Sequence, residues 1–356
     1  MRILRVAALA AGGLLLMANV VPAQAHGGSS YRWELTPTGT TAQFRGLAAV
    51  SKDVAWVAGT SGTVLRTVDG GKLWQNVSPA GAESLQFRDV EAFDARRAVA
   101  LTIGEGEDSR VYRTADGGKT WSETFRNTDA KAFYDCIAFN DDKHGLAMSD
   151  PVDGKFRIAA TSDGGRSWKI QPTDGMPAAL TGEFGFAASG TCLVAGPGRT
   201  AWFATGGGDR PRVFRTDDGG RHWTVADSPM ASGAAAGIFS LAFRNALFGV
   251  AVGGDFTKPT EAVDAASVTY DGGRTWQLVP ADQAPKGYRS GSHFVPWSPF
   301  TVIAVGPSGS DVSVDGGRSW KQFYDGSFDS VECGGHGINA GCWASGAKGA
   351  VGRLVH

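Results

Sequence analysis

The chain is poor in charge and in histidine, and it has few long apolar runs. Its 356 residues include 34 Lys or Arg, 35 Asp or Glu and six His, which gives a net charge of −1. A near-neutral balance offers no basic surface for nucleic acid. The sequence also lacks a Walker loop, a dinucleotide fingerprint, a Gly-x-Ser-x-Gly elbow and a His-Glu-x-x-His motif. We therefore expect no cofactor and no nucleic-acid partner.

The one long apolar run is at the N-terminus. The sequence MRILRVAALAAGGLLLMANVVPAQAH has two early arginines, an apolar stretch and the small-x-small motif Ala23-Gln24-Ala25, which are the parts of a secretory signal peptide. A membrane anchor is the alternative, but the run is shorter than the roughly 20 residues of a spanning helix. We expect residues 1–25 to be removed and residues 26–356 to form one secreted or periplasmic domain, monomeric and without a membrane span.

Cysteine is scarce, with four residues in the chain. Disulfides form in exported proteins, and a hairpin around GGHGINAG would place Cys333 opposite Cys342, so we predict that these two are bonded. Cys136 and Cys192 are a weaker second pair because nothing local brings them together, and the sequence leaves their pairing open. A zinc site at Cys333, His336 and Cys342 lacks further ligands at the usual spacing. We therefore predict no metal site.

Glycine is abundant, and much of it lies in a repeated eight-residue box, [ST]-x-D-G-G-x-x-W, that occurs six times. Successive box aspartates are 44 to 55 residues apart, which fits one four-stranded propeller blade with variable loops. Each period also divides into four short β-rich runs separated by turn residues, as in Phe44–Val77. The sequence therefore predicts an all-β fold, a seven-bladed β-propeller of four-stranded blades.

The seventh blade is predicted from the two ends of the chain. The C-terminal GAVGRLVH aligns with GTVLRTVD (Gly62–Asp69) and stops where a seventh box would begin. At the other end, YRWEL (Tyr31–Leu35) resembles the outer strand that follows each box. We predict that this N-terminal strand closes the last blade, which removes a free sheet edge.

Each box residue has an expected structural role. Asp-Gly-Gly suits a tight turn because the glycines take positive φ, and the aspartate accepts hydrogen bonds from the N–H groups of the turn. A Trp five residues later is large enough to fill the wedge between blades. The residues in these roles are Asp69, Trp74, Asp116, Trp121, Asp163, Trp168, Asp218, Trp223, Asp271, Trp276, Asp315 and Trp320.

The boxes resemble the Asp-box (BNR) repeats of sialidase-type propellers. Over the mature chain, the series is most similar to bacterial relatives of the photosystem II stability/assembly factor family, which are seven-bladed and without established catalysis. The resemblance implies that the box turns lie on one face of the ring. On the opposite face, the loops between blades and the loops between second and third strands would surround the central channel. It also implies a non-catalytic binding, scaffold or assembly-factor role for an unknown protein or glycan ligand.

Candidate ligand-binding residues follow from aligning the starts of the inner strands. The alignment pairs Phe44-Arg45-Gly46-Leu47 with Phe87-Arg88-Asp89-Val90, with Phe133-Tyr134-Asp135-Cys136 and with Phe328-Asp329-Ser330-Val331. Long loops on the same expected face are rich in acids and add further candidates. The predicted ligand-binding set is Arg45, Arg88, Asp89, Tyr134, Asp135, Asp150, Glu183, Asp255, Arg289, His293 and Asp329.

A glycoside hydrolase, sialidase-like or of another Asp-box type, is the alternative function. Resemblance to sialidases would assign catalytic roles to Glu183, Asp135, Tyr134 and Tyr288, with Arg45, Arg88 and Arg289 holding an anionic sugar. Other glycosidases need two carboxyl groups roughly 5–10 Å apart. The first blade departs from the sialidase motif, because FRGL (Phe44–Leu47) stands where Phe/Tyr-Arg-Ile-Pro is expected. The binding role is therefore the main prediction.

Overall fold

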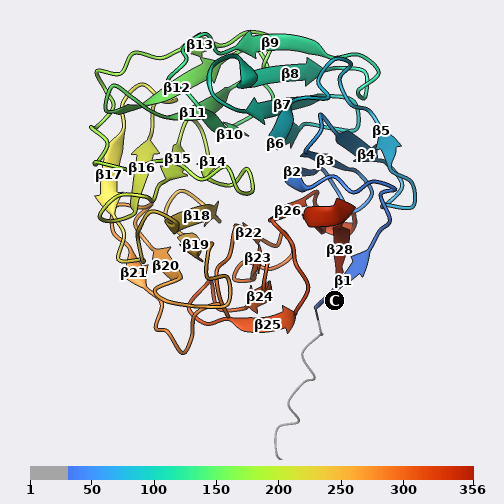
Figure 1. Cartoon of the computed structure of the whole chain (residues 1–356). Coiled ribbons are helices and arrows are strands. Elements are labelled where there is room, and N and C mark those ends of the chain that lie inside the picture. Colours follow the sequence, from blue (N-terminus) through green and yellow to red (C-terminus); the bar gives the residue numbers. More distant parts are fainter. Residues whose placement is uncertain (1–30) are drawn as a thin grey trace, which may run out of the picture. The chain divides into compact units, whose positions relative to one another are not determined.

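Each repeat of the sequence forms one blade of a ring. The computed structural model describes residues 31–356, in which seven four-stranded antiparallel sheets surround a central channel (Figure 1). The predicted signal peptide lies outside the described residues. The seven-bladed, all-β prediction is confirmed, and among the described residues the helical turns are three short 3₁₀ segments, Gly106–Asp108, Gly337–Asn339 and Ala347–Gly349.

In blades one to six, the strands follow one another outward from the channel in chain order. Blades one to three contain β2 (Phe44–Ala49), β3 (Ala55–Gly59), β4 (Val64–Thr67) and β5 (Gln75–Asn76); β6 (Gln86–Ala92), β7 (Ala98–Ile103), β8 (Arg110–Thr114) and β9 (Ser122–Arg126); β10 (Tyr134–Phe139), β11 (Gly145–Val152), β12 (Lys155–Thr161) and β13 (Lys169–Ile170). Blades four to six contain β14 (Leu193–Ala195), β15 (Ala201–Ala204), β16 (Arg212–Thr216) and β17 (Thr224–Asp227); β18 (Ala236–Phe243), β19 (Gly249–Asp255), β20 (Ala266–Thr269) and β21 (Gln277–Leu278); β22 (Gly291–Phe294), β23 (Val302–Gly306), β24 (Gly309–Ser313) and β25 (Lys321–Tyr324).

The seventh blade joins the two ends of the described chain, as predicted. It contains β26 (Ser330–Gly334), β27 (Gly341–Ser345) and β28 (Val351–Val355), and its outer strand is β1 (Arg32–Leu35), antiparallel to β28. Figure 1 shows the blue β1 beside the red β28. Trp33 of β1 is buried, and its indole N–H donates to Ser310 Oγ of blade six at 3.0 Å. Closure therefore ties blade seven to its neighbour as well.

The repeated boxes form the turns between third and fourth strands. In the second box, Asp116 Oδ1 accepts from the backbone N–H of Thr120 at 3.0 Å and from Thr114 Oγ1 at 2.9 Å. Gly117 and Gly118 take φ of 83° and 79°, a conformation that favours glycine. Hydrogen bonds, foremost from the Thr120 side chain, lower the pKa of Asp116 to about 2.

The box tryptophans of the first two blades pack across blade boundaries. Trp74 meets Trp343 of blade seven edge to face, with ring centroids 5.8 Å apart, and Trp121 meets Trp56 of blade one in the same way at 6.2 Å. Such edge-to-face pairs add attraction to the buried area. These contacts join successive blades into one ring.

Hydrogen bonds between loops show that the ring has two different faces. The box turns lie with the loops between first and second strands, since the Gly70 N–H donates to the carbonyl of Asp53. The loops between second and third strands lie with the inter-blade loops, since the Gly62 N–H donates to the carbonyl of Leu85. We call this second side the loop face. The ligand site predicted from the sequence belongs to this face.

Two disulfides join the four cysteines. Cys333 and Cys342 lie directly opposite each other on β26 and β27 with their Cα atoms 4.0 Å apart, which confirms the predicted hairpin disulfide. Cys136 on β10 pairs with Cys192, just before β14, across a Cα separation of 6.2 Å. This second bond joins the inner ends of blades three and four, neighbours in space that are 56 residues apart in sequence.

Candidate ligand-binding site on the loop face

Bulges at the start of the inner strands direct three charged side chains to equivalent places. The strand register shifts around Arg45 in blade one, Arg88 in blade two and Asp135 in blade three. A bulge of this kind bends the strand and re-aims the extra side chain. The predicted alignment of blade three was wrong by one residue: Asp135, and not Tyr134, occupies the position of Arg45 and Arg88. Sequence similarity had paired Phe133 with Phe44, whereas in the strand register Tyr134 is the residue equivalent to Phe44.

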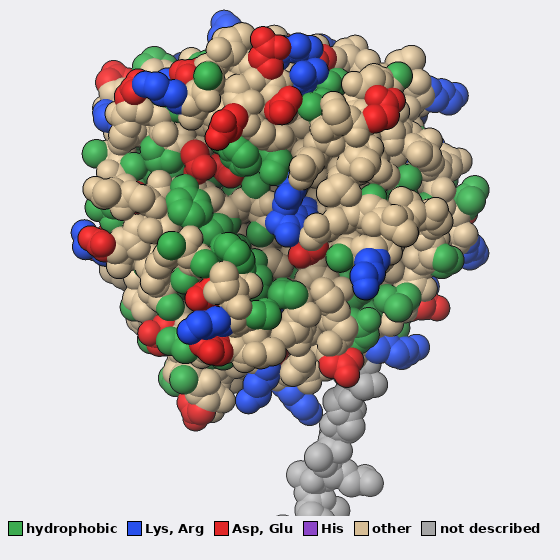
Figure 2. Space-filling model, in the orientation of Figure 1, with side chains coloured by type: hydrophobic (Ala, Val, Ile, Leu, Met, Phe, Trp, Pro, Cys, Tyr) green, Lys and Arg blue, Asp and Glu red, His purple; other side chains and the backbone are tan. Residues whose placement is uncertain are grey.

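Beside these bulges lies a cavity of about 520 Å³, which we call the loop-face groove. Blades two and three and the inter-blade loop before blade four supply its walls. Its lining combines charged and aromatic side chains: Arg88, Glu105, Lys131, Phe133, Asp135, Asp150, Phe184 and Phe186, with Ile103, Ala130, Gly185 and Ala187. Figure 2 shows a hollow near the centre of the molecule in this view, with basic and hydrophobic side chains at its edge.

Two arginines and one aspartate carry the charge near the channel mouth. Arg45 Nε lies 4.0 Å from Asp329 Oδ2 and has no hydrogen-bond partner among the described residues, whereas Gln43 Nε2 donates to that carboxyl at 3.1 Å. Arg88 donates to the carbonyl of Ala187 at 3.3 Å. Burial, with the nearby Arg45 charge, lowers the pKa of Arg88 to about 10, and burial raises the pKa of Asp329. Two guanidinium groups thus lie near one carboxyl group, and only Arg45 comes within 4.0 Å of it, which favours an additional anionic or carbonyl ligand.

Asp135 and Asp150 form a carboxyl pair in the groove. Asp135 is 2% exposed, and its Oδ2 receives no hydrogen bond from the described residues. Asp150 is partly exposed, and its Oδ1 accepts the backbone N–H of Gly185 at 2.7 Å. Burial and the Asp150 charge raise the pKa of Asp135 well above its usual range, and burial raises the pKa of Asp150 to about 7. Within residues 31–356, neither carboxyl group forms an ion pair.

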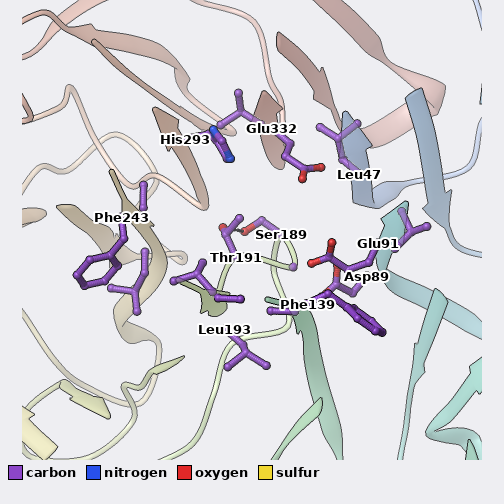
Figure 3. Close-up of a pocket in the computed structure, with 18 of the residues that line it drawn as sticks. Leu47, Asp89, Glu91, Phe139, Ser189, Thr191, Leu193, Phe243, His293 and Glu332 are labelled. Carbon is purple, nitrogen blue, oxygen red and sulfur yellow. Dashed lines mark hydrogen bonds between the residues drawn. The ribbon is translucent and has the colours of Figure 1, made fainter. Parts of the chain in front are cut away.

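A second acidic cluster lines the channel itself, in a separate cavity of about 210 Å³. Figure 3 shows the carboxyl groups of Glu91 and Glu332 pointing into this hollow, with Asp89 beside Glu91. Asp89 Oδ2 accepts the Ile137 N–H at 2.7 Å, and Glu332 Oε2 accepts the Ala49 N–H at 2.8 Å. Each donor belongs to the inner strand of the next blade, so these acids satisfy N–H groups at the open edge of that strand.

Burial in the channel raises the pKa of all three acids. The pKa of Asp89 rises to about 7 and that of Glu332 to about 8, while burial and the Glu332 charge raise the pKa of Glu91 well above its usual range. Sequence reasoning found Asp89 and missed Glu91 and Glu332. The signal was available, because both follow an equivalent inner-strand valine, in DVEAF and SVECG.

His293 also lines this cavity, and its surroundings favour a neutral ring. Its Nδ1 lies 2.8 Å from the carbonyl oxygen of Phe294, a distance that suits an Nδ1–H donor. Burial lowers the pKa of His293. The sequence predicted that this histidine lies near the channel. In the structure it lines the channel cavity and is not part of the loop-face groove lining.

Two other predicted site residues are held in buried ion pairs. Glu183 Oε1 accepts from Arg212 Nε at 2.9 Å and from Thr205 Oγ1 at 2.7 Å, and its side chain has no exposed surface. Arg289 donates from Nε to Asp311 Oδ2 at 2.6 Å, and both side chains are fully buried. These pairs fasten the two longest inter-blade loops to strands, so the charged groups face protein and not solvent.

The remaining candidates are also dispersed. Tyr134 is fully buried against Phe125, and burial raises its pKa to about 12. Tyr288 packs edge to face on Phe239, with ring centroids 4.7 Å apart, and burial raises the pKa of Tyr288 well above its usual value. Asp255 accepts hydrogen bonds from Thr257, and the Thr257 side chain is the main cause of its lowered pKa. Of the four residues suggested for glycosidase catalysis, Asp135 alone lines the groove.

Neither a metal site nor a membrane span emerges from the described part of the chain. Residues 31–356 contain no group of three or more His, Cys, Asp or Glu side chains placed to hold a metal ion. No helix within that range is long and apolar enough to cross a bilayer.

Comparison with known proteins shows similarity at the level of the fold. No protein-family profile matches the chain, and no curated protein does. A structure of YCF48 bound to D1 peptide is 16% identical, with a TM-score of 0.64 over 91% of this chain and 95% of that one. YCF48 from Cyanidioschyzon merolae is 17% identical, with a TM-score of 0.61 over 90% of this chain and 98% of that one.

A glycosidase is similar to about the same degree. The GH74 xyloglucanase from Xanthomonas campestris is 14% identical, with a TM-score of 0.61 over 90% of this chain and 53% of the enzyme. Identities this low establish a shared architecture and leave function to the site. The chain therefore has the propeller fold found both in YCF48 and in a GH74 enzyme.

Proposed function

We propose that this protein is a non-catalytic binding or scaffold protein that holds an extended segment of another polypeptide in its loop-face groove. The observation that carries the proposal is the composition of the groove, in which Phe133, Phe184 and Phe186 stand beside Arg88 and an unpaired carboxyl group. Aromatic and arginine side chains dominate the binding energy of protein interfaces. The fold shared with YCF48, which is described bound to a peptide, supports the same role.

The chemistry of the groove fits a peptide backbone with side chains on both sides. Its volume of about 520 Å³ lies in the usual range for ligand pockets. Arg88 in the groove lining supplies donors for a peptide carbonyl or carboxylate, the incompletely paired Arg45 adds a donor near the channel mouth, and the phenylalanines supply apolar contact. Because Arg88, Asp135 and Asp150 lie on strands β6, β10 and β11 of a disulfide-tied ring, little ordering is needed on binding.

The proposed location is outside the cytosol. Two disulfides fit an oxidising compartment, such as the periplasm or the extracellular space. The signal peptide predicted from the sequence supports export, and the proposed partner is therefore an exported or membrane-exposed protein.

A glycoside hydrolase is the second candidate, favoured by one observation. Asp135 and Asp150 are neighbouring carboxyl groups whose pKa values are raised in a groove, and an acid held protonated near neutral pH is what glycoside cleavage requires. Against this role, Asp135 is almost inaccessible, and Glu183 and the two tyrosines are buried elsewhere. The binding role therefore accounts for more of the site.

The decisive experiment measures peptide binding and glycoside turnover by the same preparation. The mature chain is screened against an array of 12-residue peptides, and fluorescence anisotropy gives Kd for those retained. We expect saturable binding that weakens at least tenfold in Arg88→Ala. Arg221→Ala, which changes an exposed arginine on a box turn, is the matched control and keeps wild-type affinity.

Two outcomes would contradict the proposal. One is the absence of saturable binding to any peptide, or binding that Arg88→Ala leaves unchanged. The other is turnover of an aryl glycoside, or of xyloglucan, that disappears in Asp150→Asn. The second result would establish the glycosidase in its place.

A further inference from the structure

We propose that the Asp135–Asp150 pair is a subsite for the ammonium or guanidinium group of a lysine or arginine in the bound polypeptide. The inference rests on the proposed peptide-binding function and adds the chemistry of the partner. It assigns the acidic side of the groove, whose lining also contains Arg88, to the recognition of one positive charge.

The pair contains an unsatisfied acceptor. Asp135 is 2% exposed, and no described donor reaches its Oδ2. This oxygen lies under the backbone of Gly185, where a Cβ atom would approach it to 3.2 Å. A buried acceptor without a donor is unfavourable. A positive charge held at the partly exposed Asp150 would compensate this buried acidic group electrostatically.

The protein's own cations near the pair bind other groups. Lys131 Nζ donates to Asp153 at 2.9 Å, and Arg88 donates to the Ala187 carbonyl and to Gln86 Oε1. Glu105, from blade two, adds a further negative charge to the lining. The loop segment from Phe184 to Ala187 contributes no ionisable side chain. The pair therefore faces the groove as an acidic site without a counterion.

The surroundings of the pair suit a long cationic side chain. Asp150 is partly exposed, and Asp135 lies behind it, so an incoming cation meets Asp150 first. Phe133 and Phe184 are also partly exposed beside the pair. Apolar walls suit the methylene stem of lysine or arginine, and an aromatic face attracts the charged end. A bare metal ion would use neither feature.

Proton linkage follows from the absence of a counterion. The pKa of Asp150 is raised to about 7 and that of Asp135 well above its usual range, so below neutral pH the pair is largely protonated and attracts cations weakly. A bound cation favours the ionised form and lowers these pKa values. Binding therefore releases protons, and affinity for a cationic peptide rises as pH increases through about 7.

The test uses peptides retained in the array experiment, each made in two forms. In one form a lysine or arginine is present, and in the other it is norleucine or citrulline, which keep the size and remove the charge. We expect the charged form to bind the wild-type protein at least tenfold more tightly at pH 8. The preference falls at pH 6, where affinity for the uncharged form stays constant.

The variants are Asp150→Asn and Asp135→Asn, with Asp209→Asn as the control. Asp209 is an exposed aspartate in a neighbouring loop on the same face. We expect each groove variant to lose the preference for charge while binding the uncharged peptide as the wild type does. Since Asp135 is buried, Asp150→Asn provides the result if Asp135→Asn fails to fold.

The outcomes separate the two proposals. Peptide binding that depends on Arg88 but shows no preference for charge, or a preference that survives in Asp150→Asn, overturns the cation subsite alone. Absence of peptide binding overturns both proposals. Binding of Ca²⁺ alone with comparable affinity, lost in Asp150→Asn, would replace the side-chain subsite with a metal site.

Discussion

The channel aspartate Asp89 offers a sharp test of the electrostatics of the ring. Asp89 is 4% exposed, and its carboxylate accepts one backbone N–H, from Ile137 at 2.7 Å. Substitution by Asn keeps a carbonyl oxygen for that hydrogen bond and removes only the charge. We expect Asp89→Asn to be more stable than the wild type at alkaline pH.

The magnitude follows from the raised pKa. Burial raises the pKa of Asp89 from 3.8 to about 7, so the native state binds more protons than the unfolded state across this range. Stability therefore decreases as pH rises from about 4 to about 7. At about 1.4 kcal/mol per pKa unit, the raised pKa lowers the free energy of unfolding by about 4 kcal/mol at pH 8 and by about 2 kcal/mol at pH 5. The Asn variant avoids this cost at both pH values.

The assay is urea unfolding followed by tryptophan fluorescence at pH 5 and pH 8. The stability difference between Asp89→Asn and the wild type should grow by about 2–3 kcal/mol between the two pH values. Asp209→Asn, at an exposed position, is the control and should show no such growth. A difference that is constant with pH, or smaller at pH 8, would refute the assigned cause.

Three further outcomes test the fold and the role of the buried groups. Asp116→Ala removes the acceptor of its box turn and should lower the urea midpoint of unfolding, while the folded protein binds peptide normally. Replacing Cys136 and Cys192 by serine should cost about 2–4 kcal/mol in thermal unfolding; in the wild type their tryptic peptides should remain joined until a reductant is added. Glu183→Ala leaves the Arg212 charge unpaired, so it should destabilise by about 3–5 kcal/mol; loss of activity or binding without loss of stability would mean that Glu183 acts at a site.

The loop face shows how far sequence reasoning reached and where it failed. From the positions of loops relative to the boxes it named Arg88, Asp135 and Asp150, three residues that line the loop-face groove. It could not distinguish them from Glu183 and Arg289, which lie in inter-blade loops on the same face. The difference is the partner: Arg212 and Asp311 neutralise those two, and both come from strands of the adjoining sheet.

The sequence by itself determined the features that repeat or that form over short distances. The six boxes specify turns through an aspartate, two glycines and a tryptophan within six residues, and their spacing specifies blades. Ring closure and the Cys333–Cys342 hairpin follow from the same local pattern. Tertiary structure alone decided the Cys136–Cys192 bond, the one-residue shift in blade three and the isolation of the Asp135–Asp150 pair. Those depend on strand bulges and on side chains from neighbouring blades, which meet only when the ring closes.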